Sequence, residues 1–160
     1  MPETRTAYRY ILTMMDRFTR MVKLVPLRDV TATSVALAFR KEWILQFGSP
    51  RRVITDRGTQ FTSLIFAILS RMCGFNVSFT TAYHPKMNGR LERFHHYLKQ
   101  RLRLLSLSRK LDFVDIDDWE QFLPNIAFAY NVTRNRMTQF SPYELVFNAS
   151  VQTADRKSTR

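Results

Sequence analysis

Two carboxylates, Asp56 and Glu92, are the residues of this sequence best suited to do chemistry. Asp56 follows a short β-favouring segment, and Glu92 lies in the first turn of the longest helical pattern, after a polar loop predicted at residues 82–89. Carboxylates at a strand end and on a neighbouring helix can bind hard divalent cations, which activate a water or hydroxyl at a phosphodiester. Taken singly, each has a simpler reading, because an Asp after a strand is usually a turn residue and a Glu in a helix's first turn usually compensates the helix dipole.

The elements that must position this pair can be read from periodicity. Strands are predicted over residues 8–15, 21–25, 52–55 and 76–80, the first two as an antiparallel hairpin. Helices are predicted over residues 33–47, 63–72 and 90–107, with one more starting at Asp117 or Asp118 and kinked at Pro124. A last helix begins at Ser141, where Ser141-Pro142-Tyr143-Glu144 forms a capping box. This order favours an α/β domain with a mixed sheet flanked by helices.

The size and charge of the chain indicate its class of partner. We expect one domain over residues 1–150 and a disordered polar tail over residues 151–160. Lys and Arg number 25 against 13 Asp and Glu, a formal charge of +12, which favours a polyanionic partner such as nucleic acid over a merely soluble basic protein. The apolar runs are shorter than the roughly 20 residues of a membrane span, and no secretory signal is visible. We therefore expect a nuclear or cytoplasmic protein that is not secreted.

Six short motifs follow one another along residues 8–148. They are Tyr10-Ile11-Leu12 with Asp16-Arg17-Phe18-Thr19-Arg20, Trp43 with Phe47-Gly48-Ser49-Pro50, Thr55-Asp56-Arg57-Gly58-Thr59-Gln60-Phe61, Tyr83-His84-Pro85 with Asn88-Gly89 and Glu92-Arg93, Ala129-Tyr130-Asn131, and Ser141-Pro142-Tyr143-Glu144-Leu145-Val146-Phe147. In this order and at this spacing they resemble the integrase core of gypsy-type LTR retrotransposons, a retroviral integrase-like group of the RNase H-like superfamily.

The resemblance assigns Asp56 and Glu92 as the second catalytic Asp and the catalytic Glu, which bind Mg²⁺ or Mn²⁺ for 3′-processing and strand transfer of DNA. The family's first catalytic Asp lies on an opening strand, and residues 1–7 contain no Asp. We therefore expect a core truncated at its N-terminus, without the first strand and the bridging carboxylate, and with little or no strand-transfer activity by itself. Asp16 matches a different family Asp and is predicted to cap a turn.

The long helix is the predicted DNA-binding element. Glu92, His96, Lys99 and Arg103 step by four, three and four, so they share one stripe that could lie along phosphates. The resemblance implies that Lys99 contacts the DNA end and that Asn88, Gly89 and Gln60 position the substrate. A solvated helix face would also explain the stripe, and ordinary loop polarity would explain the other three.

Two further classes of function stay open at this point. A non-enzymatic, domesticated module could keep the fold and the basic surface for DNA or for a protein partner. A structural scaffold could use the fold only to self-associate, and a homodimer is expected from the family in any case. Metal titration separates the enzyme from the binding module, because only the former needs Asp56 and Glu92 to hold a cation.

Overall fold

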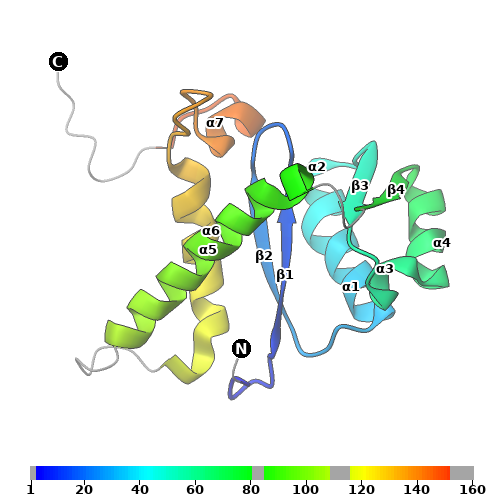
Figure 1. The fold of residues 1–160 in the computed structure, drawn as a ribbon, viewed down its shortest axis with the longest axis horizontal. Helices are drawn as coiled ribbons and strands as arrows, with labels where there is room; N and C mark the ends of the chain where they lie inside the picture. Colours follow the sequence, from blue (N-terminus) through cyan, green and yellow to red (C-terminus); the bar gives the residue numbers. More distant parts are fainter. Residues whose placement is uncertain (1–2, 81–84, 109–115, 152–160) are drawn as a thin grey trace.

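The computed structural model describes residues 3–80, 85–108 and 116–151, which form two sheets and several helices (Figure 1). The strands are β1 (Tyr10–Met15), β2 (Val22–Leu27), β3 (Arg52–Thr55) and β4 (Asn76–Phe79). The helices are α1 (Ala32–Phe39), the π-helical η1 (Arg40–Ile44), α2 (Leu45–Phe47), α3 (Thr59–Thr62), α4 (Leu64–Cys73), α5 (Pro85–Ser108), the 3₁₀ segment η3 (Ile116–Phe122), α6 (Leu123–Val132) and α7 (Pro142–Phe147).

Strands β1 and β2 form the predicted antiparallel hairpin, in the register Tyr10 opposite Leu27 and Met15 opposite Val22. The Asp16 N–H donates to the Met21 carbonyl at 2.9 Å. Because hydrogen-bonded pairs alternate along an antiparallel ladder, Ile11, Thr13 and Met15 direct their backbone groups away from β2. That edge of β1 bonds to no other strand in the described residues.

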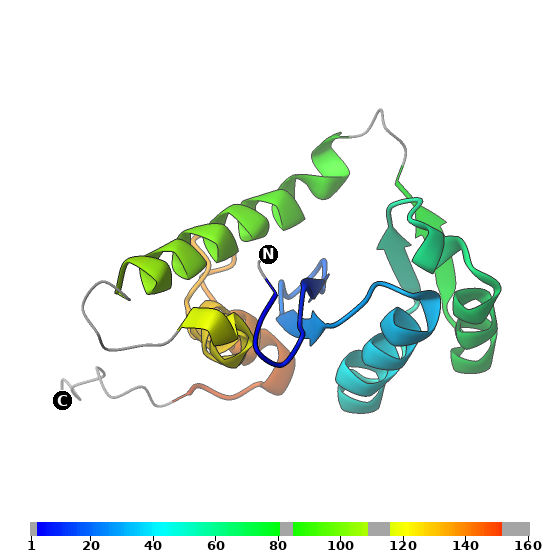
Figure 2. The same ribbon diagram turned by 90° about the horizontal axis from the view of Figure 1, so that it is seen from below.

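Both faces of the hairpin are covered. On one face Val22 and Leu24 pack with Phe94 and Leu98 of α5 and with Leu123 of α6. On the other face a second cluster joins β1 to α1, α4 and the start of β4, through Met14, Phe39, Phe66 and Phe75. Figure 2 shows the hairpin between these two groups of helices. Because side chains alternate along a strand, an apolar residue at nearly every position is what a strand buried on both faces requires.

Strands β3 and β4 pair in parallel, with Arg52 opposite Asn76 and Thr55 opposite Phe79. Their connection contains α3 and α4, the crossover that parallel pairing needs. Helix α4 begins at Ser63, whose side chain accepts from the Phe66 N–H, and it ends at Gly74 with a left-handed φ of 73°. The α/β class is as predicted, and both pairing directions of a mixed sheet occur. Among the described residues, however, they occupy two separate two-stranded sheets.

Several boundaries differ from the sequence-based predictions. Residues 85–89 were predicted to be loop but belong to α5, because Pro85 stands at its first position and a proline there has the φ that a helix needs. The predicted helix does not run unbroken from Asp117 or Asp118: the backbone of Asp118 is non-helical at a kink within η3, and the N-cap of α6 is Phe122. Pro124 lies in the first turn of α6, where its missing N–H costs nothing, so it does not kink a helix.

Of two other predictions, one is confirmed and one falls almost wholly outside the described residues. The Ser141 capping box is confirmed, since Ser141 accepts from the Glu144 N–H and the Glu144 carboxylate accepts from the Ser141 N–H. The predicted polar tail falls almost wholly on residues 152–160, outside the described part of the chain, as do residues 82–84 of the predicted loop.

Candidate active site and nucleic-acid interface

Asp56 stands directly after β3, as predicted, and its side chain is exposed. The Gly58 N–H donates to Asp56 Oδ1 at 3.0 Å, and the Thr55 hydroxyl donates to the Asp56 carbonyl at 2.6 Å. These two bonds hold the turn at the strand end. Asp56 Oδ2 has no hydrogen-bond partner among the described residues, so one carboxylate oxygen is available to a ligand.

Gln60 is brought to this same turn by a close contact with Gly58. A Cβ atom added at Gly58 would lie 2.5 Å from Gln60 Nε2, so a residue with a side chain at position 58 would displace the glutamine. The sequence analysis identified Gln60 as a candidate but not its contact with Gly58. The contact involves the flexible end of the Gln60 side chain, which could move to make room, and short-range spacing carries no signal of it.

Glu92 lies on α5, which reaches the end of β3 by a short route. The Thr80 N–H donates to the Thr55 carbonyl at 2.8 Å, so β4 ends beside β3, and four residues, 81–84, separate Thr80 from Pro85. Five extended residue steps span at most about 18 Å, which limits how far the start of α5 can lie from Thr80. Glu92 is the eighth residue of α5 and is not in its first turn, so compensation of the helix dipole no longer explains it.

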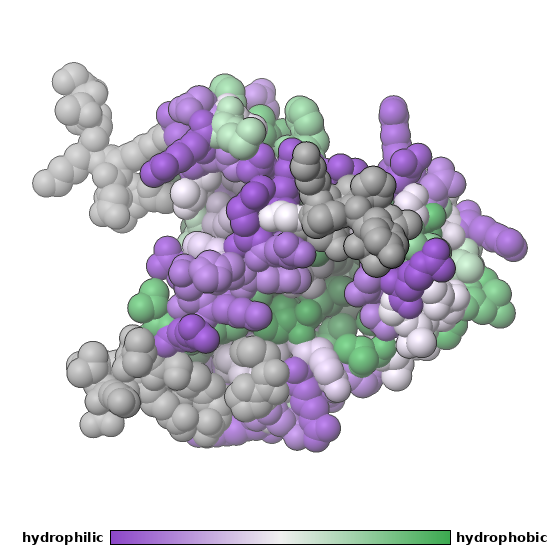
Figure 3. Space-filling model, viewed as in Figure 1, coloured by the Kyte–Doolittle hydropathy of each residue, from purple (hydrophilic) through white to green (hydrophobic). Residues whose placement is uncertain are grey.

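The predicted stripe is on the solvent side of α5. Glu92, His96, Lys99 and Arg103 are all exposed, whereas Phe94 and Leu98 are buried on the opposite face. Figure 3 shows hydrophilic residues along this helix. The ring of His96 makes a 2.9 Å hydrogen bond with the Gln100 amide. Lys99 and Arg103 give the C-terminal half of this stripe two exposed cations, which suits contact with phosphates.

The pKa of His95 reflects its burial and the charges of two residues in this stripe. Burial lowers the pKa of His95, the ammonium of Lys99 lowers that pKa further, and the carboxylate of Glu92 opposes both. Glu92 and Lys99 are therefore close enough to act on one ring, although no bond joins them to Asp56 or Gln60 in the described residues.

Asn88 and Gly89 lie near the start of α5 and not in an extended loop. Their predicted role in substrate positioning depends on residues 81–84, which lie outside the described part of the chain.

The donor set of Asp56 and Glu92 fits a hard divalent ion in chemistry, because Mg²⁺ and Mn²⁺ prefer carboxylate oxygens. The set is small: no cluster of three His, Cys, Asp or Glu side chains able to hold a metal occurs within residues 3–80, 85–108 and 116–151. Asp16 belongs to no such cluster, since its Oδ2 accepts from the N–H groups of Phe18 and Thr19 and from the Thr19 hydroxyl. The predicted turn cap is confirmed.

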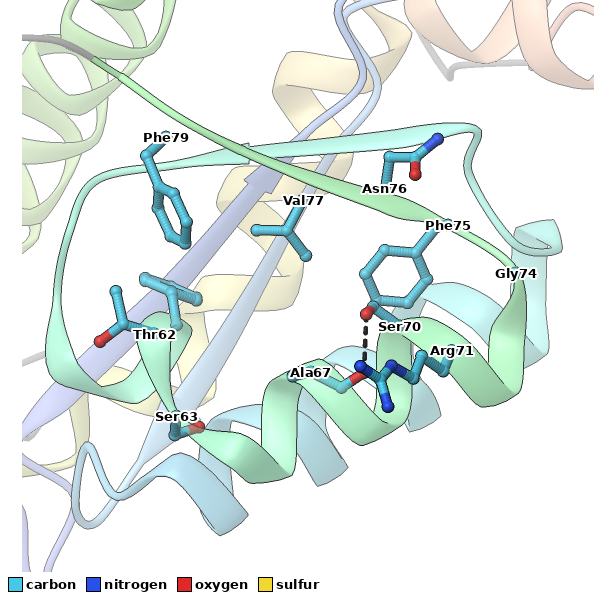
Figure 4. Close-up of a pocket in the computed structure, with 11 residues that line it drawn as sticks. Thr62, Ser63, Ala67, Ser70, Arg71, Gly74, Phe75, Asn76, Val77 and Phe79 are labelled. Carbon is cyan, nitrogen blue, oxygen red and sulfur yellow. Dashed lines mark hydrogen bonds between the residues drawn. The ribbon is translucent and has the colours of Figure 1, made fainter.

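A cavity of about 650 Å³ lies away from these carboxylates, between α4 and the β3–β4 sheet (Figure 4). Phe61, Phe75, Val77 and Phe79 supply its apolar wall, and Arg71 stands at its rim. None of the candidate site residues lines it, so the cavity plays no part in the chemistry of Asp56 and Glu92.

The family model of the integrase core domain matches residues 2–85 of this sequence, more than half of the chain. This chain belongs to the integrase core domain family. The retrovirus-related Pol polyprotein from transposon 412 of Drosophila melanogaster is 27% identical to this integrase core over 147 residues, 92% of the chain. The chain spans only 8% to 13% of the length of such curated relatives.

Solved structures confirm the predicted integrase-core fold. The catalytic core domain of BIV integrase matches with a TM-score of 0.68 at 22% identity, over 86% of this chain and 85% of that one. The HTLV-2 integrase catalytic core domain, in complex with magnesium in a trimeric form, matches with a TM-score of 0.67 at 17% identity, over 85% and 83%. The gypsy-type origin of this integrase core stays a prediction.

None of the described helices combines the length and the apolarity that a membrane span requires. Even α5, the longest of them at 24 residues, has a negative mean hydropathy.

Proposed function

We propose that this integrase core acts on DNA, with Mg²⁺ or Mn²⁺, in the 3′-processing and strand transfer by which a retroelement joins its DNA to a target. One observation carries the proposal: exposed Asp56 stands where β3 ends beside β4, exposed Glu92 lies on the helix that follows β4, and the stripe that holds Glu92 continues with Lys99 and Arg103. The magnesium in the related HTLV-2 core supports the choice of ion. Such a role would be exercised in the nucleus or the cytoplasm, and a homodimer is proposed as the assembled form.

The proposed role of each residue follows from its position. Asp56 and Glu92 would hold the divalent ion, which when bound supplies Lewis-acid stabilisation of the phosphodiester oxygens and activates a water or hydroxyl. Gln60 would orient the reacting group beside Asp56. Lys99, His96 and Arg103 would hold the DNA backbone along α5, with Lys99 at the DNA end, while Asn88 and Gly89 would border the substrate from the start of the helix.

Cation binding tests the metal half of the proposal. Titration of Mn²⁺, followed by its EPR signal, should give weak binding that falls at least tenfold in Asp56→Asn and in Glu92→Gln. Glu3→Gln is the matched control, since Glu3 is an exposed carboxylate in an ion pair with Arg9 remote from the site. Equal Mn²⁺ affinity in all four proteins would contradict the assignment.

DNA affinity tests the other half. In fluorescence anisotropy with a duplex oligonucleotide, Lys99→Gln and Arg103→Gln should each weaken binding and reduce the slope of log K against log salt by about 0.9. Arg40→Gln makes the same charge change on an exposed side chain of η1 and should have little effect. An equal loss in all three variants would mean that only net charge attracts the DNA.

We further propose that this chain by itself performs little strand transfer, because two carboxylates hold a pair of ions less firmly than three. Strand transfer in Mg²⁺ that clearly exceeds background and disappears in Asp56→Asn would overturn this part.

The alternative function is a binding module without catalysis. It is favoured by the absence of a third ligand near Asp56 and Glu92 in the described residues. Salt-sensitive DNA binding combined with no measurable Mn²⁺ binding would establish it in place of the enzyme. Loss of DNA binding with a retained dimer would instead favour a scaffold.

A further inference from the structure

A second, smaller cavity lies beside α5, on a different side from the stripe. Its volume is about 210 Å³, and it is lined by Met15, Arg20, Arg90, Arg93, Phe94 and Tyr130. Arg90 and Arg93 are three residues apart and share one helix face. Glu92 is rotated from Arg93 by about 100° around α5, so the carboxylate of the candidate metal site belongs to another face.

Half of the residues that line this cavity are arginines, and none is acidic. Among the described residues, none of the three guanidinium groups forms an ion pair. Arg90 Nη1 donates to the Arg17 carbonyl at 3.0 Å, and Arg20 Nη2 contacts Met137 Sδ at 3.6 Å. Neither contact neutralises charge, so the cavity collects positive charge that nothing in the described fold compensates.

One of the three arginines, Arg20, lies in the turn between β1 and β2. Arg20 has a left-handed φ of 66°, which L-residues adopt rarely, and its N–H donates to the Asp16 carbonyl at 3.0 Å. The bond from Arg90 to Arg17 then ties α5 to the same turn. Backbone strain of this kind gathers at functional sites, where the surrounding structure enforces it.

Tyr130 supplies a neutral donor to the same cavity. Its ring packs edge-on against Phe94 with centroids 4.8 Å apart, which fixes the position of the hydroxyl. Burial raises the pKa of Tyr130 against the opposing charges of Arg20 and Arg93, so the hydroxyl stays protonated at neutral pH. Arg20 and Arg93 line the same cavity as this hydroxyl.

We propose that Arg20, Arg90, Arg93 and the Tyr130 hydroxyl form a subsite for one phosphate group. Guanidinium forks bind phosphate oxygens in pairs, and the hydroxyl adds one more donor. The volume is about seven times the roughly 30 Å³ share of a water molecule, enough for a phosphate and a few waters, and below the roughly 300 Å³ at which small-molecule pockets begin. The phosphate comes from a DNA backbone or from a free phosphate ion. The DNA source deepens the proposed function and rests on it, whereas the free ion does not.

The first arm of the test uses pyrophosphate and inorganic phosphate as probes, followed by the tyrosine ring signals in NMR and by calorimetry. Arg93→Gln, Tyr130→Phe and Arg20→Gly should each weaken pyrophosphate binding, the two arginine variants by tenfold or more. Arg20→Gly also removes the strain at a positive φ, so the protein should fold at least as well as the wild type. Arg40→Gln is the charge-matched control and should bind pyrophosphate like the wild type.

The second arm repeats the titration with duplex DNA. If the source is DNA, Arg93→Gln weakens DNA binding as well and lowers the salt slope by about 1. Lost pyrophosphate binding with unchanged DNA affinity assigns the subsite to a free ion. Pyrophosphate binding that survives in both arginine variants overturns the proposal, whatever the Mn²⁺ titration of Asp56 and Glu92 gives.

Discussion

Two aspartates of the same chain show how surroundings decide what a carboxylate does. Asp16 Oδ2 accepts three hydrogen bonds from the turn that follows it, all at 3.1 Å or less, so this oxygen is committed to structure. Asp56 accepts one bond on Oδ1, and its Oδ2 accepts none among the described residues. Spacing alone does not separate the two, because a threonine stands three residues after each, Thr19 after Asp16 and Thr59 after Asp56. The family resemblance distinguished them at the level of sequence, and the hydrogen bonds of the folded turns distinguish them in the structure.

His95 gives a residue-scale prediction about pH. Its pKa is depressed, so below the usual value of about 6.5 the unfolded chain binds a proton that the folded chain does not. The free energy of unfolding should therefore decrease as pH falls from 6.5 towards the lower, folded pKa. Urea denaturation across this range should show the decrease, and His95→Gln should reduce it.

NMR titration of His95 in two variants tests the effects of the Lys99 and Glu92 charges on its pKa separately. Lys99→Gln should raise the pKa of His95, and Glu92→Gln should lower it further, because one charge opposes protonation and the other favours it. Shifts of the same sign in both variants would show that structural rearrangement governs the titration.

At the scale of elements, a single side chain joins α6 to the hairpin. Asn131 accepts from the Val22 N–H and donates to the Val22 carbonyl, both at 2.9 Å, so its amide stands where a neighbouring strand would be. Asn131→Ala should cost about 2 to 4 kcal/mol, since it leaves two buried backbone groups without partners. The free energy of unfolding from urea denaturation measures the loss.

Asn125→Ala provides the comparison, because Asn125 is exposed on the same helix. Because Ala has the higher helix propensity, Asn125→Ala should not destabilise the protein, and a similar loss in both variants would mean that the bonds to β2 do not explain the effect.

Elements whose signals are local could be predicted from the sequence, and elements set by distant contacts could not. The hairpin, β3, α4 and α7 follow from alternation and capping residues within a few positions. The predicted end of the second strand at Val25 was too early, because Pro26 is tolerated where its missing N–H would face away from β1. The role of Asn131 was also missed, since a polar residue in a helix does not show which backbone it will bond.

The same distinction between local and distant signals applies to the residues of the candidate site. Asp56, Gln60 and the exposed stripe were predicted by spacing and by the family resemblance. The arginine cavity was not, because Arg20 and Arg93 are far apart in the sequence and meet only when the hairpin turn packs on α5.

On the scale of the whole molecule, the hairpin belongs to both hydrophobic clusters, so neither should unfold without the other. Trp119 is buried in the cluster with α5 and α6, and Trp43 packs against the cluster with α1 and α4. In Trp43→Phe and in Trp119→Phe, the remaining tryptophan should report a urea midpoint equal to that from far-UV circular dichroism. A fluorescence midpoint clearly below the circular dichroism midpoint in one variant would show a cluster that opens alone.

The two edges of the hairpin are unequal, and this limits how copies of the molecule can associate. The outer edge of β2 is blocked at two positions. The Asn131 amide already bonds to the N–H and the carbonyl of Val22, and Pro26 has no N–H to donate. In the described chain, β1 keeps its outward donors and acceptors open. Among the described residues, this hairpin can therefore be extended along its whole length only at β1, and two hairpins paired there would present only the partly blocked edges of β2.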